Sequence, residues 1–136
     1  LYRTGVAHHN ILIYDYQPGR GQCYPKEFLK DFNGYPQTDG YEVYKKIDGV
    51  TQIGCMTHGR RKIVEALKAM SAESEGKQIA GSILKLINLI FSEDKKLVTL
   101  DYTKRHNKRL EKIEPLFDQL LEHLHAANLK TQQVVF

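Results

Sequence analysis

The sequence predicts a mixed α/β protein in which a sheet flanked by helices is followed by a helical hairpin. Three observations support this fold class. The first half contains short β-branched and aromatic runs that end at Pro and Gly. These runs alternate with segments whose apolar residues recur at helical spacing, whereas the second half shows helical spacing alone. We therefore expect two domains, an α/β core over residues 1–72 and a helical subdomain over residues 73–136.

The first half is predicted to contain four strands and three helices. The strands are short and bounded by turn-forming residues, and they cover residues 1–6, 11–16, 35–38 and 50–55. The helices have apolar residues three or four positions apart, and they cover residues 25–32, 41–47 and about 57–72. The order strand-strand-helix-strand-helix-strand-helix implies one mixed sheet with helices packed on it.

Two segments of this half have features that restrict their local structure, the turn between the first two strands and the start of the first helix. Residues 1–6 and 11–16 resemble a hairpin with His8 and His9 in its turn, and adjacent turn residues point apart, so we do not expect the two histidines to bind metal as a pair. Pro25 stands at the predicted start of the helix over 25–32, where its fixed φ and missing N–H are tolerated.

The second half is predicted to form a long amphipathic helix and at least one more, arranged as a hairpin. The long helix has Ile79, Ile83, Leu86, Ile87 and Ile90 on one face. Residues 110–124 have a Leu and Ile stripe at the same spacing. Residues 99–101 are expected to cap a helix between them.

Composition restricts the class of protein. No apolar run approaches the roughly 20 residues of a membrane helix, so we expect no membrane span. Cys23 and Cys55 are too few for a disulfide scaffold, which favours a reducing compartment and a cytoplasmic location. The first residue is not Met and no signal pattern follows it, so we expect a piece of a longer chain.

The net charge of +4 is modest, but its distribution is uneven. The basic residues gather in two clusters: Arg60, Arg61 and Lys62 in one, and Lys104, Arg105, Lys108 and Arg109 in the other. Such clusters suit a polyanionic partner such as DNA. They equally suit the solvated faces of two amphipathic helices, and composition alone leaves both interpretations open.

Asp39 is the residue most suggestive of catalysis. It follows a predicted strand and precedes Gly40, which allows a sharp turn. In two-metal phosphoryl transfer, carboxylates on neighbouring elements hold the metal ions, but one Asp cannot do so alone. Asp-Gly is also an ordinary turn or capping signal, and the residues by themselves do not exclude that simpler role.

Cys55 and His58 form a second group of chemically active residues, at a predicted strand-to-helix junction. Their spacing can supply two zinc ligands, but a structural zinc site needs about four and no second pair is present. A buried cysteine and a histidine at the start of a helix, both structural, explain the pair as well.

Together these motifs resemble the transposase family of insertion sequence 66. The residues that carry the resemblance are the run Gly-Tyr-Pro-Gln-Thr-Asp-Gly-Tyr over 34–41, then Tyr44, then Cys55, His58, Arg60, Arg61 and Lys62. The family has "G-x-x-Q-T-D-G-Y-x-x-Y" and then "C-W-A-H-A-R-R-K-F". Met56, Gly59 and Ile63 depart from the second pattern, and the similarity continues more loosely into the helices.

The resemblance implies a bacterial DNA transposase with a ribonuclease H-like core, which uses an Asp-Asp-Glu triad and Mg²⁺ or Mn²⁺ to cut and join DNA. Asp39 would match the second acid and bind metal, with Gly40 and Tyr41 completing its motif. The family's "Asp-Glu-Thr" and "Asn-Asn-x-x-Glu" motifs, which carry the other two acids, do not occur in this sequence. We therefore expect residues 1–72 to be a partial catalytic core, residues 73–136 a helical insertion, and this piece alone to be inactive.

The resemblance also implies partners and location: transposon ends and target DNA, an oligomer in the active nucleoprotein complex, and a place near the bacterial nucleoid. Two alternatives remain. One is a non-catalytic nucleic-acid-binding or assembly module that uses the two basic clusters. The other is a small zinc-stabilised domain, which has few ligands to support it.

Overall fold

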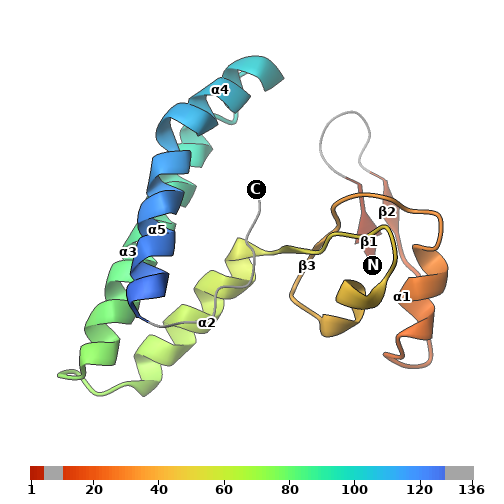
Figure 1. Cartoon of the computed structure of the whole chain (residues 1–136), viewed down its shortest axis with the longest axis horizontal. Coiled ribbons are helices and arrows are strands. Elements are labelled where there is room, and N and C mark those ends of the chain that lie inside the picture. The colour runs from red at the N-terminus through yellow and green to blue at the C-terminus, as the bar shows by residue number, and fades with distance from the viewer. Residues whose placement is uncertain (5–10, 128–136) are drawn as a thin grey trace. The chain divides into compact units, whose positions relative to one another are not determined.

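The computed structural model describes residues 1–4 and 11–127, and it confirms a mixed α/β class. The chain divides into two compact units, each described separately. The α/β unit comprises Leu1–Pro36 and Tyr41–Gln52, and the helical unit comprises Gln37–Gly40 and the chain from Ile53 onward. Figure 1 labels α1 to α5 and β1 to β3.

In the α/β unit, the two predicted N-terminal strands pair as expected. Strand β1 (Tyr2–Arg3) runs antiparallel to β2 (Leu12–Ile13), with Tyr2 opposite Ile13. Both are shorter than predicted, and the predicted turn with His8 and His9 lies outside the described residues.

The first helix of this unit differs in its bounds from the prediction. Helix α1 spans Cys23–Phe28, whereas the predicted helix covered residues 25–32. Pro25 still lies in the first turn, where the structure does not need its N–H. Leu29 leaves the helical conformation at φ −102° and ψ 11°. Its carbonyl accepts a hydrogen bond from the Phe32 backbone N–H at 2.9 Å, which closes a tight turn, so Phe32 lies beyond the helix.

The rest of the α/β unit is held by short-range structure. The predicted helix over 41–47 is a 3₁₀ helix, η1 (Glu42–Lys46), and Gly34 forms a parallel bridge with Val50. Gly49 has φ +76°, and a Cβ there would lie 3.3 Å from the backbone oxygen of Phe32, so the position requires glycine. Among the described residues of this unit, few side chains are buried: Pro25, Leu29 and Ile47.

The helical unit begins with a second pair of strands. Strand β3 (Gln37–Thr38) runs parallel to β4 (Ile53–Gly54), with Gln37 opposite Ile53 and Thr38 opposite Gly54. The described strands thus form two separate two-stranded sheets and not the single mixed sheet that we predicted. Strand patterns in a sequence locate strands, but strand partners depend on contacts between distant segments.

Four helices follow the β4 strand. They are α2 (Met56–Ala69), α3 (Glu75–Lys96), α4 (Tyr102–Lys112) and α5 (Glu114–Ala126). The prediction of at least one more helix after α3 is met by α4 and α5. The apolar stripe over residues 110–124 spans both of them, because α4 ends at Lys112 and α5 starts with Pro115 in its first turn. Proline cannot continue the hydrogen-bond ladder of α4, so it starts a new helix instead.

The predicted cap between the long helices is confirmed. The Asp101 carboxylate accepts a hydrogen bond from the Lys104 backbone N–H at 3.0 Å and so caps α4. Ser74 caps α3 in the same way, through the Lys77 backbone N–H at 3.3 Å.

One apolar core joins the helices of this unit. It is formed by buried side chains from α2, α3, α5 and the turns between helices: Met56, Ile83, Ile87, Ile90, Leu97, Ile113 and Leu120. Helix α2 packs on α3 and α3 on α5. Helix α2, which lies before residue 72, therefore shares a core with the helices after it, while the proposed domain boundary at residue 72 stays a prediction. Among the described residues, no helix is long and apolar enough to cross a membrane.

Candidate functional site

Asp39 lies directly after strand β3 and is exposed to solvent. Gly40 then turns the chain with φ 91°, and its backbone N–H donates to the Thr38 hydroxyl at 3.2 Å. A non-glycine residue would be strained in this backbone conformation. The strand end and the glycine turn occur together, as the sequence predicted, and the structure adds that the carboxylate between them is exposed.

Strand β3, which directly precedes Asp39, is joined to the start of α2 by a backbone hydrogen bond. The Cys55 backbone N–H donates to the Thr38 carbonyl at 2.8 Å, and Cys55 occupies the N-cap position of α2. The Cys55 carbonyl in turn accepts hydrogen bonds from the backbone N–H groups of His58, at 3.0 Å, and Gly59, at 3.2 Å. The residue before Asp39 and the first turn of α2 are therefore held by consecutive hydrogen bonds.

The Cys55 and His58 side chains form no metal site with other described residues. Cys55 is a free, half-buried thiol that makes no capping hydrogen bond. The His58 Nδ1 atom is buried without a hydrogen-bond partner among the described residues. Within residues 1–4 and 11–127, no group of three or more His, Cys, Asp or Glu residues could hold a metal ion. The zinc-domain interpretation therefore has no support in this part of the chain.

The first basic cluster has two kinds of member. Arg60 donates from Nε to the Asn88 side-chain oxygen at 2.7 Å, which ties α2 to α3. Arg61 and Lys62 are exposed and make no hydrogen bond or ion pair to any residue that the structure describes. Arg61 and Lys62 are therefore the members of this cluster whose charges are available to an external phosphate.

In the second cluster, two arginines are engaged within the protein. Arg105 donates to the carbonyls of Val98, at 2.8 Å, and Leu100, at 2.9 Å, in the turn between α3 and α4. Arg109 makes a two-point ion pair with Asp94 of α3, with its Nε 2.7 Å from Oδ1. Sequence reasoning grouped these two arginines with the lysines because a charge pattern does not show which cations have internal partners.

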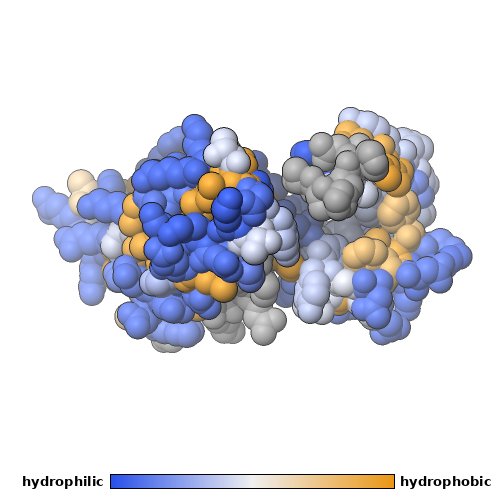
Figure 2. Space-filling view, turned by 90° about the horizontal axis from the view of Figure 1, so that it is seen from above, coloured by the Kyte–Doolittle hydropathy of each residue, from blue (hydrophilic) through white to orange (hydrophobic). Residues whose placement is uncertain are grey.

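The two lysines of this cluster make weaker contacts. Lys104 lies 3.2 Å from Asp101 and Lys108 lies 2.6 Å from Glu111, both as exposed pairs three residues apart on the helix. Exposed pairs of this kind contribute about 0–1 kcal/mol, so a phosphate can displace the acidic partner at little cost. Figure 2, seen from above Figure 1, shows a mostly hydrophilic surface at the end of the helical unit that carries α4.

Tyr41, the last member of the motif around Asp39, has a structural position. Its hydroxyl donates to the Arg20 carbonyl at 2.6 Å, and its own carbonyl accepts from the Gln52 side chain at 3.0 Å. These contacts connect the start of η1 with two distant segments of the α/β unit.

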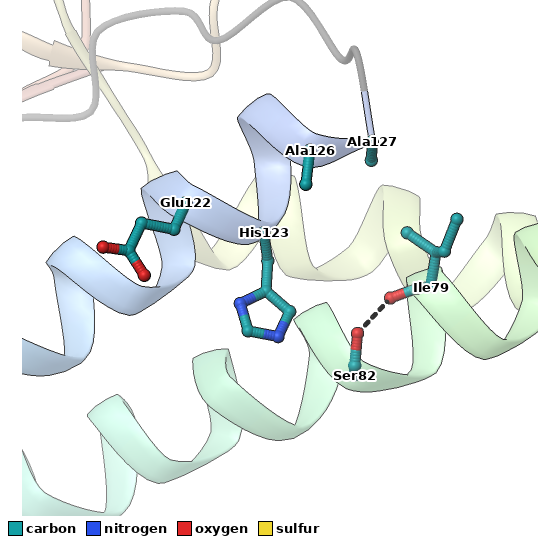
Figure 3. Close-up of a pocket in the computed structure, with 6 residues that line it drawn as sticks. All are labelled: Ile79, Ser82, Glu122, His123, Ala126 and Ala127. Carbon is teal, nitrogen blue, oxygen red and sulfur yellow. Dashed lines mark hydrogen bonds between the residues drawn. The ribbon is translucent and has the colours of Figure 1, made fainter.

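The structure also contains a groove that sequence reasoning did not predict. It lies between α3 and α5, has a volume of about 330 Å³, and is lined by Ile79, Ser82, Glu122, His123, Ala126 and Ala127. Figure 3 shows the His123 ring pointing from α5 towards α3. The Ser82 hydroxyl donates to the Ile79 carbonyl at 2.7 Å, and His123 Nδ1 lies 2.8 Å from the Gln119 carbonyl oxygen. None of the predicted site residues lines it, and no local motif in the sequence marks it.

These features define a basic α/β chain with an exposed carboxylate at a strand end. The model of the family described as "Transposase IS66 family" matches residues 1–135, and the chain belongs to this family. A transposase family acts on DNA, so the function of the chain is related to transposition and DNA is its general kind of partner. No curated protein and no solved structure matches the chain.

Proposed function

We propose that this chain is part of a transposase that cuts and joins DNA strands by phosphoryl transfer, and that Asp39 is one of its acidic catalytic residues. The observation that carries the proposal is the exposed Asp39 carboxylate immediately after strand β3, within a chain whose family match extends over residues 1–135. Sheets in α/β proteins present functional groups at the carboxyl ends of their strands. The ribonuclease H-like core and the Asp-Asp-Glu triad belong to this proposal.

The local structure favours a positioned carboxylate over a mobile one. Asp39 is preceded by a residue whose carbonyl is bonded to the Cys55 N–H, and it is followed by a glycine turn bonded to the Thr38 hydroxyl. Both bonds restrict the backbone on either side of the carboxylate, so less conformational entropy is lost when the carboxylate binds a ligand.

The described residues do not by themselves fit a two-metal site. No group of three possible ligands occurs among them, and Asp39 is the only one of the three acids that the sequence matches to the family pattern. We therefore propose Mg²⁺ or Mn²⁺, which prefer carboxylate oxygens, as cofactors only of a protein that also contains the other two acids. We further propose that such a protein works on transposon ends and target DNA as an oligomer.

The test is Asp39→Asn in a complete transposase that contains this chain. We expect strand transfer to fall below about 1% of the unsubstituted rate, the scale of loss seen when a group that stabilises the transition state is removed. Asp31→Asn, which changes another exposed carboxylate, is the matched control and should leave strand transfer intact.

A non-catalytic DNA-binding module is the second candidate, and the exposed, unpaired Arg61 and Lys62 favour it within the described residues. Strand transfer that survives Asp39→Asn, together with unchanged salt-dependent DNA binding, would support this candidate and remove Asp39 from the mechanism.

A further inference from the structure

We infer that Arg60 is a positioning residue for Asp39 and not a DNA contact. Its hydrogen bond to Asn88 fixes the start of α2, to which the strand before Asp39 is bonded. The inference rests on the proposed function only for the catalytic role of Asp39. It goes further by giving a different role to a residue that its charge alone placed among the DNA-binding candidates.

The segment that carries Asp39 belongs to the helical unit. Residues Gln37–Gly40 group with the chain from Ile53 onward. The residues before and after them, Leu1–Pro36 and Tyr41–Gln52, form the α/β unit. The position of this segment therefore depends on β4 and on the helices that follow it.

Backbone hydrogen bonds connect this segment with the first turn of α2. Thr38 pairs with Gly54 of β4, and the Thr38 carbonyl accepts from the Cys55 N–H at 2.8 Å. Cys55 is the N-cap of α2, so a rotation or shift of this helix moves the donor that holds Thr38. The direction in which the next residue, Asp39, leaves the strand therefore follows the orientation of α2.

Apolar packing alone does not fix that orientation. Met56, the first residue of α2, is buried in one core with Ile83 and Ile87 of α3, but apolar contacts have no preferred direction. Arg60 supplies a directional contact one turn later, because its Nε donates to the Asn88 side-chain oxygen at 2.7 Å. The positive charge of the donor strengthens this bond. It therefore limits how far α2 can turn about its own axis against α3.

The next residue in the chain, Arg61, makes no such contact. Arg60 is half-buried and bonded to Asn88, whereas Arg61 is exposed and has no hydrogen bond or ion pair within the part of the chain that the structure describes. Turning Arg60 towards a phosphate would break its bond to Asn88, and Arg61 has no such bond to lose. Arg61 is therefore the matched control for Arg60.

The first experiment measures amide hydrogen exchange in the 136-residue chain by NMR. Arg60→Ala and Asn88→Ala should each make the Cys55 N–H exchange about 10-fold faster, because loss of a charged hydrogen bond loosens the first turn of α2. The amides of α5 should change little. Asn88→Asp keeps an acceptor oxygen and should retain the protection. Ser74→Ala, which removes the cap of α3, should leave the Cys55 N–H protected.

The second experiment separates positioning from DNA binding in a complete transposase that contains this chain. Arg60→Ala and Asn88→Ala should each slow strand transfer by about 10- to 100-fold, since a misplacement of about 1 Å costs up to about 100-fold. The double variant should be no slower than either single variant, because both remove the same bond.

Anisotropy of a fluorescein-labelled DNA duplex over a series of salt concentrations measures binding by the same variants. Arg60→Ala and Asn88→Ala should leave the affinity and its salt slope unchanged. Arg61→Ala should show the opposite pattern, with weaker binding and a salt slope reduced by about 1.

Three results would overturn the inference. One is unchanged exchange at the Cys55 N–H in both Arg60→Ala and Asn88→Ala. Another is full strand transfer in both variants when Asp39→Asn is inactive. The third is a loss of DNA affinity and salt slope in Arg60→Ala that Asn88→Ala does not share, which would make Arg60 a phosphate contact. Strand transfer that survives Asp39→Asn would instead refute the proposed function, and the exchange experiment would still decide whether the Arg60–Asn88 bond holds the strand before Asp39.

Discussion

The helical unit and the α/β unit are stabilised differently. The helical unit has a continuous core in which α3 alone contributes Ile83, Ile87 and Ile90, each at most 4% exposed. The α/β unit buries few side chains and leaves large apolar residues such as Leu12, Ile13 and Tyr14 exposed, at 47%, 43% and 80%. Leu12 and Ile13 are adjacent on β2 and point to opposite faces, so neither face of this strand is fully covered by the described residues.

Most of the apolar burial in the described residues lies in the helical unit. Burial of apolar surface is the main favourable term in folding, and a pair of two-residue strands cannot supply much of it. We therefore expect the helical unit to unfold as a cooperative structure, and the α/β unit to contribute less to the total stability.

The largest expected effect concerns the helical core. Ile87→Ala should lower the free energy of unfolding by about 2–5 kcal/mol, because it removes a side chain that is 4% exposed and leaves a cavity. Leu89→Ala, at a position of the same helix that is 43% exposed, should cost much less. Denaturant unfolding followed by helical circular dichroism measures both. Equal losses would show that the core is not where the stability lies.

A smaller effect is expected at the turn between α3 and α4. Arg105→Ala should lower the free energy of unfolding by about 1–3 kcal/mol, because two carbonyls lose a charged donor. Arg105→Lys should restore little of this, since an ammonium lacks the planar fork that reaches both carbonyls. Hydrogen exchange at the amides of α4 is the measurement. Unchanged protection in the alanine variant would return Arg105 to the group of DNA-binding candidates.

The smallest expected effect concerns the ionisation of Tyr2, the partly enclosed tyrosine of the β1–β2 pair. Burial, and then the nearby Tyr44 and Asp15, raise the pKa of Tyr2 from 10.0 to about 12, and its ring stacks on Phe28 with centroids 3.7 Å apart. The protonated form is therefore favoured by folding. The contribution to stability is complete below pH 10 and is lost as the pH rises towards 12.

Tyrosinate absorbance over this pH range measures the effect. We expect an ionisation step near pH 12 that disappears in Tyr2→Phe, which keeps the ring. If the unsubstituted chain has no such step, the β1–β2 pair does not enclose Tyr2 in solution, and the contrast between the two units is larger than the structure indicates.

Much of the candidate site could be predicted because its signals are local. The strand before Asp39, the turn at Gly40 and the helix that follows Cys55 each depend on a few consecutive residues, and the structure has all three. The metal-binding and catalytic role of Asp39, by contrast, depends on acids that the family pattern carries on other segments, and it stays a prediction.

The sequence by itself determined the order of helices and strands, because apolar spacing and turn residues act over one or two turns of the chain. It also determined family membership, through the motif around Asp39 and the basic residues after Cys55. The sequence analysis left the number of helices after α3 open, although Pro115 in the first turn of α5 marks where α4 gives way to α5.

The tertiary structure was needed to show which strands pair with each other and which charged side chains form hydrogen bonds or ion pairs within the protein. It separated the strands into two sheets, packed α2 on α3 through Met56 and Ile63, and gave Arg105 and Arg109 partners inside the protein. The physical reason is distance along the chain. A hydrogen bond or an apolar contact is decided by which groups meet in space, and residues such as Arg109 and Asp94 meet only after the helices have packed.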